Sequence, residues 1–353
     1  MSPPSMEQSF VIGSIQTKVG PVPRISSTLV WADRFGSYKA RWRINRMNYK
    51  VDPGLYAMGK PDDKAPVVVT ANYKMTFDRL RETLPGRNVW ILVLDTRGIN
   101  VWCAAGKGTF GTKELVGRIG SSGLAQVVSH RELILPQLAG PGVSAHLVKK
   151  SSGFKVVYGP IRAEDLPTFL DAGFKATPDM RLKSFTTKER AVLIPVELVG
   201  AFKIALIVLP IVFLTDSLWR AGAFWSDGLS HGLYSVLAVV TAILTGAVLT
   251  PLLLPRLPGR AFSFKGLILG VLAALVFMMV RWSSWETWPD RLEMGTWCLV
   301  IPAISAYIAM NFTGASTYTS LSGVRKEMRR AVPLEIGAGI LGLGCWLGSH
   351  FIS

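Results

Sequence analysis

Long apolar runs, separated by short polar connectors, fill the carboxyl-terminal half of this 353-residue chain and limit how it can fold. A helix of about 20 apolar residues spans a bilayer, and runs of this length are distinct from short buried strands. We therefore expect an all-α membrane domain of five transmembrane helices over residues 186–353. The expected spans are 191–214, 232–254, 266–280, 294–310 and 332–352, of which the third and fourth are short.

The connectors between these runs differ in charge, and this difference predicts an orientation. Short cytoplasmic loops are enriched in Lys and Arg. The connectors before the first span and after the second and fourth are basic, whereas "TDSLWRAGAFWSDGLSH" and "RWSSWETWPDRLE" contain acidic residues and tryptophan. We expect a multi-pass protein of the cytoplasmic (inner) membrane, with a cytoplasmic amino-terminal domain and the C-terminus outside. The start "MSPPSMEQSF" has no basic or apolar signal region, so no cleavable signal peptide is expected.

The net charge of +16 does not by itself indicate nucleic-acid binding. Much of it falls at the expected membrane boundaries, where basic residues contact anionic headgroups. The stretch "YKARWRINRMNYK" is basic, but no zinc-finger spacing or RNA-recognition signature accompanies it. Three cysteines without a CxxC pair argue against a disulfide scaffold, a structural zinc site or an iron–sulfur cluster in this chain. We expect no nucleic-acid partner, and any electrons would come from another protein.

Alternating strand and helix patterns predict an α/β, Rossmann-like domain over residues 1–185. Such a three-layer sheet binds ligands beyond the carboxyl ends of its strands. The expected strands lie in "APVVVTANYK", "VWILVLD", "AQVVS", "ELILPQLAGPG" and "FKVVYG". The expected helices lie in "TFDRLRETL", with Thr76 or Asp78 as its cap, "TKELVGRIG" and "RAEDLPTFLDAG". Thr70, Asp95, Ser129, Gln137 and Gly159 would then lie at or near the strand ends.

The stretch "NVWCAAGKGTFGT", residues 100–112, contains Cys103, the one cysteine outside the apolar half. Its Gly-Lys pair lacks the GxxxxGK[ST] spacing of a phosphate loop, which argues against nucleotide hydrolysis. A nucleophilic thiol with His130 or His146 as its base stays open, and so does a buried packing role. Small neighbours favour a third interpretation, because they let a backbone lie flat against a large planar ligand. These neighbours are Ala104, Ala105, Gly106 and Gly108.

The residues "NVWCAAGK" resemble the signature of the corrinoid protein family of bacterial and archaeal mercury methylation, the HgcA family. The stretches "VTANYKMTFDRLR" and "PQLAGPGVSAHLVKKSSGFKVVYGPIRAEDLP" and the five-span half are similar to the same family. The resemblance covers most of residues 50–353. The soluble part is also similar to the corrinoid domain of the corrinoid iron–sulfur protein of acetyl-CoA synthesis.

This resemblance implies a cobalt corrinoid (cobalamin) held at the sheet edge, with Cys103 as the catalytic residue and lower axial cobalt ligand on a capping helix. A thiolate is a soft, strongly donating ligand, and it favours passing a methyl group to an electrophile such as Hg(II). Metal ligation removes the thiol proton. The resemblance also implies a group of residues that contact the corrinoid or shape the cap: Thr70, Asn72, Thr76, Asn100, Val101, Trp102, Ala104, Ala105, Gly106, Lys107, Gln137 and Gly159.

The resulting hypothesis is a corrinoid-dependent methyltransferase that moves a methyl group from methyl-cob(III)alamin to Hg(II) and forms methylmercury. Its expected partners are a ferredoxin-like iron–sulfur protein (HgcB type), as reductant and source of Hg(II), and a methyl donor such as a methyl-folate. The alternative is a membrane-anchored corrinoid or methyl carrier of one-carbon metabolism that does not act on mercury.

Ionisable residues within membrane spans are functional candidates, and Glu197, Lys203 and Glu335 lie in the expected spans. Glu197 and Glu335 fall near the expected cytoplasmic boundary, where they would reach water. Cys298 and Cys345 are expected to pack as small apolar residues, and a relay of Hg(II) is the alternative for both.

Overall fold

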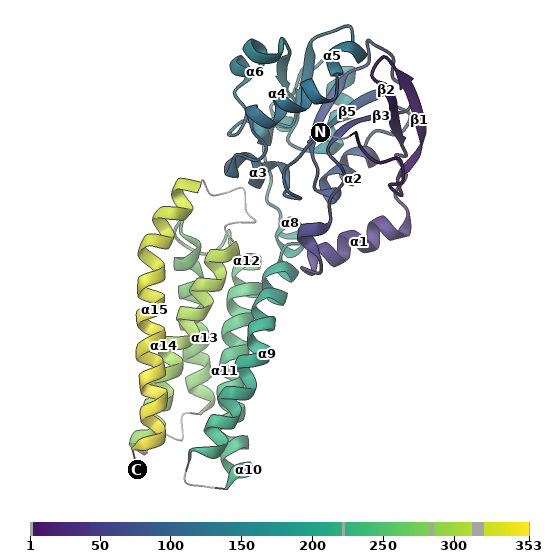
Figure 1. Ribbon diagram of the computed structural model, residues 1–353. Helices are drawn as coiled ribbons and strands as arrows, with labels where there is room; N and C mark the ends of the chain where they lie inside the picture. The colour runs from purple at the N-terminus through teal and green to yellow at the C-terminus, as the bar shows by residue number, and fades with distance from the viewer. Residues whose placement is uncertain (1–2, 221–222, 282–285, 313–320, 353) are drawn as a thin grey trace. The chain divides into compact units, whose positions relative to one another are not determined.

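A computed structural model of the chain describes residues 3–220, 223–281, 286–312 and 321–352 (Figure 1). It divides into two compact units, Met1–Ser184 and Phe185–Ser353, which we call unit 1 and unit 2. Each unit contains its own clusters of buried apolar residues. We therefore describe each unit by itself.

Unit 1 contains a seven-stranded sheet in the order β1-β2-β3-β5-β4-β6-β7. Strands β4, β5, β6 and β7 are parallel, whereas β3 is antiparallel to β5, and the hairpin of β1 and β2 extends the sheet beyond β3. The strands are β1 Val11–Thr17, β2 Gly20–Ile25, β3 Gly54–Met58, β4 Val67–Ala71, β5 Val89–Leu94, β6 Glu132–Leu135 and β7 Lys155–Tyr158.

Strand β5 is wholly apolar, and Thr70 is the one polar residue of β4, as suits strands covered by helices on both faces of the sheet. Alternate residues of β4 and β5 enter two separate cores, as the two-residue period of a strand requires. Helices α3, α4, α5 and α6 contribute residues to one core, and α2 and α7 contribute residues to the other. The helices are α1 Trp31–Arg41, α2 Lys74–Glu82, α3 Val101–Lys107, α4 Thr112–Ser121, α5 Leu124–Val127, α6 Ala145–Ser152 and α7 Leu166–Asp171, with short 3₁₀ turns η1 Arg46–Asn48, η2 Gln137–Ala139, η3 Ala163–Asp165 and η4 Asp179–Arg181.

The sheet is mixed, because β3, a strand that the sequence analysis did not predict, runs against β5. Two sequence-based expectations for unit 1 are wrong in detail. The stretch "AQVVS" lies in and just after helix α5 and does not form a strand. Helix α2 begins at Lys74 after Tyr73, so Thr76 and Asp78 lie inside it and neither is its cap.

The described residues of unit 2 include five helices long and apolar enough to cross a membrane: Thr187–Leu218, Phe224–Leu253, Phe262–Val280, Trp288–Asn311 and Gly323–Phe351. The third and fourth are longer than the short spans expected from the sequence. The individual elements are α8 Thr187–Ala191, α9 Ile194–Leu218, α10 Phe224–Asp227, α11 Leu233–Leu244, α12 Thr250–Leu253, α13 Phe262–Val280, α14 Trp288–Asn311 and α15 Leu321–Phe351, with π-helical turns η5 Gly228–Gly232 and η6 Thr245–Leu249.

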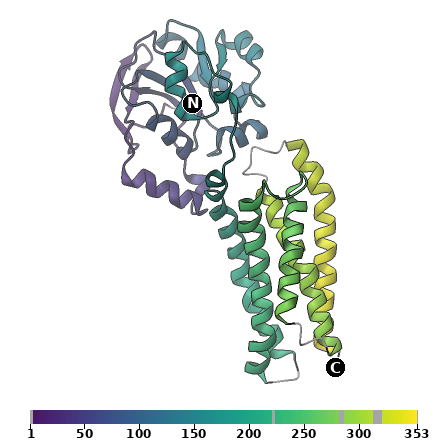
Figure 2. The same cartoon turned by 180° about the vertical axis from the view of Figure 1, so that it is seen from behind.

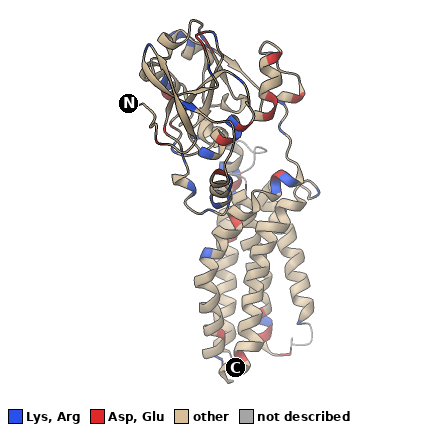
Figure 3. Cartoon of the chain, turned by 90° about the vertical axis from the view of Figure 1, so that its right-hand side faces the viewer, with Lys and Arg blue, Asp and Glu red and all other residues tan. Residues whose placement is uncertain are grey.

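Helix α14 packs against both α13 and α15, and the two opposite views show these helices side by side (Figures 1 and 2). Close packing requires small residues, as is common between helices in membranes. A Cβ added to Gly266 would lie 2.5 Å from Ala309 Cβ, and one added to Gly270 would lie 2.6 Å from Pro302 Cα. Most of the length of the helices carries neither Lys, Arg, Asp nor Glu (Figure 3). Large apolar side chains such as Ile207 and Val276 are exposed, as suits a lipid-facing surface.

Candidate functional site

The carboxyl ends of four parallel strands meet at one edge of the sheet in unit 1. Strands β4, β5, β6 and β7 end there at Ala71, Leu94, Leu135 and Tyr158. Ligands of open α/β sheets bind beyond this kind of edge. Of the predicted site residues, those that follow these strand ends directly or closely are Asn72, Asn100 to Lys107, Gln137 and Gly159.

Asn72 joins the end of β4 to the loop that follows β5. Its Oδ1 accepts hydrogen bonds from the backbone N–H of Thr96 and of Gly98, both at 3.0 Å. Its Nδ2 donates to Asp95 Oδ1 at 3.1 Å. The side chain is 1 % exposed. The carboxamide of Asn72, a residue predicted to contact a cofactor or shape the cap, holds the loop that leads to Cys103.

Helix α3 carries Cys103 and begins at Val101, directly after this loop. Asn100 is its N-cap, because Asn100 Oδ1 accepts a hydrogen bond from Cys103 N at 2.9 Å. Val101, Ala104 and Ala105 are buried in the core. Cys103 is half-buried and Lys107 is exposed. Helix α3 therefore holds the thiol of Cys103 in a partly exposed position at the carboxyl edge of the sheet.

The protonation of Cys103 depends on opposing effects. Burial raises the pKa of the thiol above its ordinary value. The hydrogen bond from Asn100 and the charges of Lys107 and Arg46 act in the opposite direction but do not outweigh burial. The balance therefore favours the protonated thiol at neutral pH.

A second loop lies directly against α3. A Cβ at Gly142 would be 2.2 Å from Phe110 O and 2.9 Å from Ala105 Cα, so only glycine allows this approach. The backbone N–H of Thr112 donates to Gly142 O at 3.2 Å, and Ser144 N donates to Thr112 Oγ1 at 2.8 Å. The segment "PQLAGPGVSAH" thus closes one side of the edge beside the cysteine helix.

The remaining predicted residues differ in their exposure. Thr70 lies within β4 and is 3 % exposed, and Gly159 is also buried. Gln137 is half-buried in η2, and its Oε1 accepts a hydrogen bond from Arg181 Nη1 at 2.8 Å. Thr76 is half-buried in the first turns of α2. Of these four, Gln137 and Thr76 present surface at or near the edge, whereas Thr70 and Gly159 support the sheet beneath it.

Two residues considered from the sequence lie at the opposite edge. Ser129 precedes β6, and its N–H donates to Asp63 O at 2.8 Å, ahead of β4. His130 Nε2 lies 3.0 Å from Ala65 O, at the start of β4. Ser129 is therefore not at a carboxyl end, as was expected, and His130 is not a base for Cys103.

The segment around η1 forms another part of the edge, and the sequence analysis missed it. A Cβ at Gly98 would be 2.8 Å from Met47 O, so this segment packs on the loop after β5. The N–H of Val51 donates to Asn72 O at 2.9 Å. Arg46 is close enough for its charge to act on the thiol of Cys103. The available signal was the basic stretch "YKARWRINRMNYK", which was considered only as a possible nucleic-acid site.

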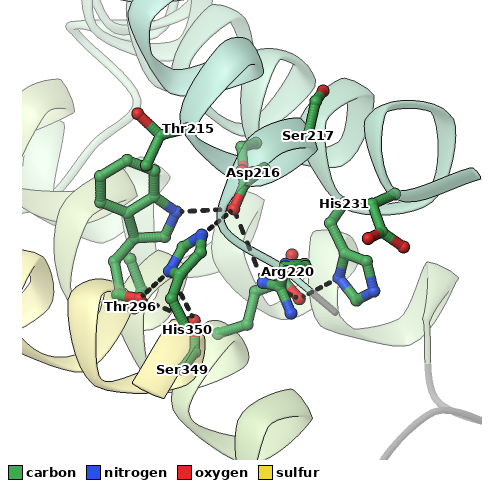
Figure 4. Close-up of polar contacts among 12 residues, drawn as sticks. Thr215, Asp216, Ser217, Arg220, His231, Thr296, Ser349 and His350 are labelled. Atoms are coloured by element: carbon green, nitrogen blue, oxygen red, sulfur yellow. Dashed lines mark hydrogen bonds and ion pairs between the residues drawn. The ribbon is translucent and has the colours of Figure 1, made fainter. Parts of the chain in front are cut away.

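Unit 2 contains a buried polar network at one end of the helix bundle (Figure 4). Asp216 of α9 accepts hydrogen bonds from Ser235 Oγ at 2.5 Å and from Trp346 Nε1 at 3.2 Å. His350 Nε2 lies 2.9 Å from Asp216 Oδ1. Arg220 Nη2 lies 3.6 Å from the same carboxylate. The network therefore joins α9, α11 and α15.

Glu293 of α14 continues this network. It pairs with His231 Nδ1 at 2.6 Å, Arg281 Nη1 at 3.0 Å and Arg220 Nη2 at 3.2 Å. Ligand atoms of His231, Asp290 and Glu293 lie within 4.8 Å of one another, which is a spacing that a metal site allows. Two guanidinium groups already neutralise Glu293, so the group is a structural ion-pair cluster rather than a good cation site.

Cys298 and Cys345 lie on different helices of unit 2. Cys298 lines a cavity of about 980 Å³ between α13, α14 and α15, and its Sγ lies 2.9 Å from Met278 Sδ. Cys345 is half-buried on α15. Both positions suit packing residues.

Comparisons with known proteins match the part of unit 1 that contains this site. Residues 44–170 match the family model described as the CO dehydrogenase/acetyl-CoA synthase delta subunit. The chain is 32% identical over 124 residues to the acetyl-CoA decarbonylase/synthase complex subunit gamma of Methanopyrus kandleri, covering 35% of this chain and 26% of that protein. It is 34% identical over 122 residues to the subunit of the same name from Methanocaldococcus jannaschii, covering 34% of this chain and 25% of that protein.

The similarity is therefore local. The chain spans about a quarter of the length of these curated relatives. The matched residues include β3 to β7 and helix α3, so the whole carboxyl edge of the sheet lies inside the match. Unit 2 lies outside it.

Proposed function

We propose that unit 1 binds a corrinoid at the carboxyl edge of its sheet and that the chain transfers methyl groups. The observation that carries this proposal is the half-buried thiol of Cys103 on α3, held at that edge by Asn72 and Asn100. The similarity of residues 44–170 to subunits of acetyl-CoA decarbonylase/synthase complexes supports it. So does the resemblance of "NVWCAAGK" to a corrinoid-protein signature.

The residues at the edge fit such a cofactor in their chemistry. A bound cobalt corrinoid supplies a metal that accepts and gives up a methyl group. Cys103 offers one soft donor for that metal, and Gly106 beside it has no side chain to block a planar ring. Lys107 and Arg46 favour the thiolate, which offsets part of the effect of burial. In this proposal Trp102, Ala104 and Ala105 shape the cap, Gln137 and Thr76 line the edge, and Thr70, Asn72 and Gly159 support it.

We propose Hg(II) as the methyl acceptor on two grounds. The first is the resemblance of the cysteine stretch to the mercury-methylation family. The second is the chemistry of an anionic thiolate, whose strong donation favours release of the methyl group with its electron pair to an electrophile.

The alternative acceptor is a partner of one-carbon metabolism, for which this chain would serve as a methyl carrier. The names of the similar proteins favour this alternative, because they are subunits of acetyl-CoA decarbonylase/synthase complexes. The fold and the position of Cys103 suit both acceptors equally.

Either function requires other molecules. The chain has three cysteines and no CxxC pair, so we propose that a ferredoxin-like iron–sulfur protein supplies electrons. We propose a methyl-folate as the methyl donor. For Hg(II) transfer, the same iron–sulfur protein would deliver the metal ion.

We further propose that the five long helices of unit 2 cross the cytoplasmic membrane and leave unit 1 in the cytoplasm. The support is the excess of Lys and Arg in the connectors that this orientation places inside. A reporter fused after residue 353 should then be active only outside the cytoplasm. Activity inside the cytoplasm would contradict this orientation.

Cys103→Ala tests the site, with Cys298→Ala as the matched control. The full chain is purified in detergent, loaded with methylcobalamin and followed by its absorption spectrum. We expect Cys103→Ala to lose the thiolate-ligated spectrum, whereas Cys298→Ala keeps it. A wild-type spectrum in Cys103→Ala would rule out Cys103 as a donor to the corrinoid metal.

The acceptor is tested with the wild-type chain. The methyl-loaded, reduced protein is given Hg(II), and methylmercury is measured. Formation of methylmercury that Cys103→Ala abolishes supports the mercury proposal. Binding of the corrinoid through Cys103 without methylmercury formation supports the carrier alternative.

A further inference from the structure

Helix α1 of unit 1 exposes a stripe of aromatic side chains. Trp31, Phe35, Tyr38 and Trp42 are 73%, 41%, 61% and 52% exposed. Successive residues of an α-helix advance by about 100°, so these four positions lie within about 60° of arc. The rings of Trp31 and Phe35 stack with their centroids 4.8 Å apart. Just beyond the helix, the side chains of Ile44 and Met47 are also exposed.

Basic residues flank this stripe. On the helix, Arg34 and Arg41 fall on one side of the aromatic positions and Lys39 on the other. Beyond the helix the chain adds Arg43, Arg46 and Lys50. The only acidic residue among positions 31–50 is Asp33, and it is buried.

The opposite face of α1 is fixed to the body of unit 1. Asp33 Oδ1 lies 2.6 Å from Lys74 Nζ, and Asp33 Oδ2 lies 2.7 Å from Arg81 Nη2. Ala40 is fully buried. A Cβ at Gly36 would lie 2.7 Å from the ring of Tyr49, so the helix is packed closely on this side. These contacts keep the aromatic stripe directed away from the core of unit 1.

We propose that the surface formed by residues 31–47 docks on the anionic headgroups of a phospholipid membrane. A helix with aromatic residues on one face and Lys and Arg beside them is typical of interfacial helices. Tryptophan and tyrosine favour the headgroup region, and anionic lipids attract the basic flanks. This proposal is independent of what the sheet edge binds.

The covalent connection between the two units favours a membrane, rather than a protein or a nucleic acid, as the partner of this surface. Unit 1 is continuous at residue 184 with a unit that contains five candidate membrane helices. A tethered surface is present at a high effective concentration, so weak contacts suffice to hold it.

The test uses the full chain in nanodiscs and measures hydrogen–deuterium exchange of residues 31–44. We expect exchange to be at least about fivefold slower with phosphatidylglycerol added than in phosphatidylcholine alone. This factor corresponds to the binding free energy of about 1 kcal/mol that one basic residue contributes at an anionic surface. Salt of about 1 M shortens the Debye length to about 3 Å and should remove most of this difference.

Two charge-reversal variants provide the comparison. Lys39→Glu/Arg43→Glu should lose the dependence on phosphatidylglycerol. Lys149→Glu/Lys150→Glu makes the same change of charge at exposed positions of α6 and should keep it. Unchanged exchange of the β5 amides in both variants verifies that unit 1 stays folded.

Three results would overturn the proposal. One is exchange of residues 31–44 that does not depend on the lipid. Another is an equal loss of the dependence on phosphatidylglycerol in both charge-reversal variants, because such a loss would reflect the net charge of the chain alone. The third is protection that appears only after a soluble protein or an RNA is added, which would assign the surface to that partner.

Discussion

At the scale of single residues, the reactivity of Cys103 is set by its surroundings. Burial raises the pKa of the thiol, and Lys107 and Arg46 partly oppose this. A raised pKa means that less thiolate is present at any pH below it, because the neutral form is favoured.

We predict that alkylation of Cys103 by iodoacetamide in the cofactor-free chain is slow at pH 7. Because the thiol pKa is raised, the rate should continue to rise with pH beyond the pH at which an ordinary cysteine reaches its maximum. Lys107→Gln removes a favourable charge and should slow the reaction by about 1.5- to 5-fold at fixed pH, as for an exposed charge. Mass spectrometry of the peptide that contains Cys103 measures the rate. A rate that is already maximal at pH 7 would show that the positive charges outweigh burial.

Asn72 acts on the site through the loop that it holds. We predict that Asn72→Ala destabilises unit 1 by about 1–3 kcal/mol, because it leaves buried backbone N–H groups without their acceptor. It should also weaken corrinoid binding, although Asn72 presents almost no surface to a ligand. Thermal unfolding and a spectroscopic titration measure the two effects.

Asn88→Ala is the matched control for Asn72→Ala. Asn88 Oδ1 accepts a hydrogen bond from Lys60 N at 2.8 Å, in a turn at the other edge of the sheet. Its loss should leave corrinoid binding unchanged. If Asn72→Ala bound corrinoid as well as Asn88→Ala does, Asn72 would have no positioning role.

The sequence pointed to residues near this edge but not to what each one does. Asn72 and Asn100 both come after strand ends, where polar side chains suggest ligand contacts. The partners of Asn72 lie 24 and 26 positions away in the chain. Sequence spacing cannot show that such distant backbone groups consume its hydrogen bonds. The N-cap role of Asn100 is local, with its partner three residues away.

At the scale of elements, the parallel strands β4 to β7 of unit 1 were the most predictable. Strand β5 is a continuous apolar run, β4 is interrupted only by Thr70, and helices cover both of their faces. The hairpin of β1 and β2 was missed because its sequences, "VIGSIQT" and "GPVPRI", contain glycine and proline, which are rare in strands. The strand predicted over "AQVVS" was wrong, because five residues are too few to distinguish a strand from a helical turn.

The close approach of α14 to Gly270 of α13 leads to a prediction about helix packing in unit 2. Gly270→Ala would place a Cβ 2.6 Å from Pro302 Cα of α14. We predict a destabilisation of about 1–3 kcal/mol, as for overpacking of a filled interior. Thermal unfolding of the full chain in detergent measures it. Gly344→Ala on α15 is the control, since nothing lies within 4 Å of its added Cβ. Equal unfolding temperatures for the two variants would contradict the close packing of α13 and α14.

At the scale of the whole molecule, the sequence divides where its apolar content changes. Unit 1 ends at Ser184 and unit 2 begins at Phe185, followed closely by the first long helix. Apolar runs long enough to span a bilayer are visible from length alone. The exposed aromatic stripe of α1 could not be recognised in the same way, because a periodic apolar pattern does not show whether a core or a lipid surface covers it.

The separate cores of the two units lead to a prediction about unit 1 alone. Both faces of its sheet are covered by its own helices, and Cys103, Asn72 and the segment around Gly142 all lie within it. We predict that a chain ending at residue 184 folds cooperatively and binds corrinoid with the same absorption spectrum as the full chain. Circular dichroism on heating and a corrinoid titration measure these properties. A folded chain that binds no corrinoid would mean that unit 2 contributes to the site. An unfolded chain would mean instead that the sheet depends on unit 2 for its stability, a dependence that two complete cores argue against.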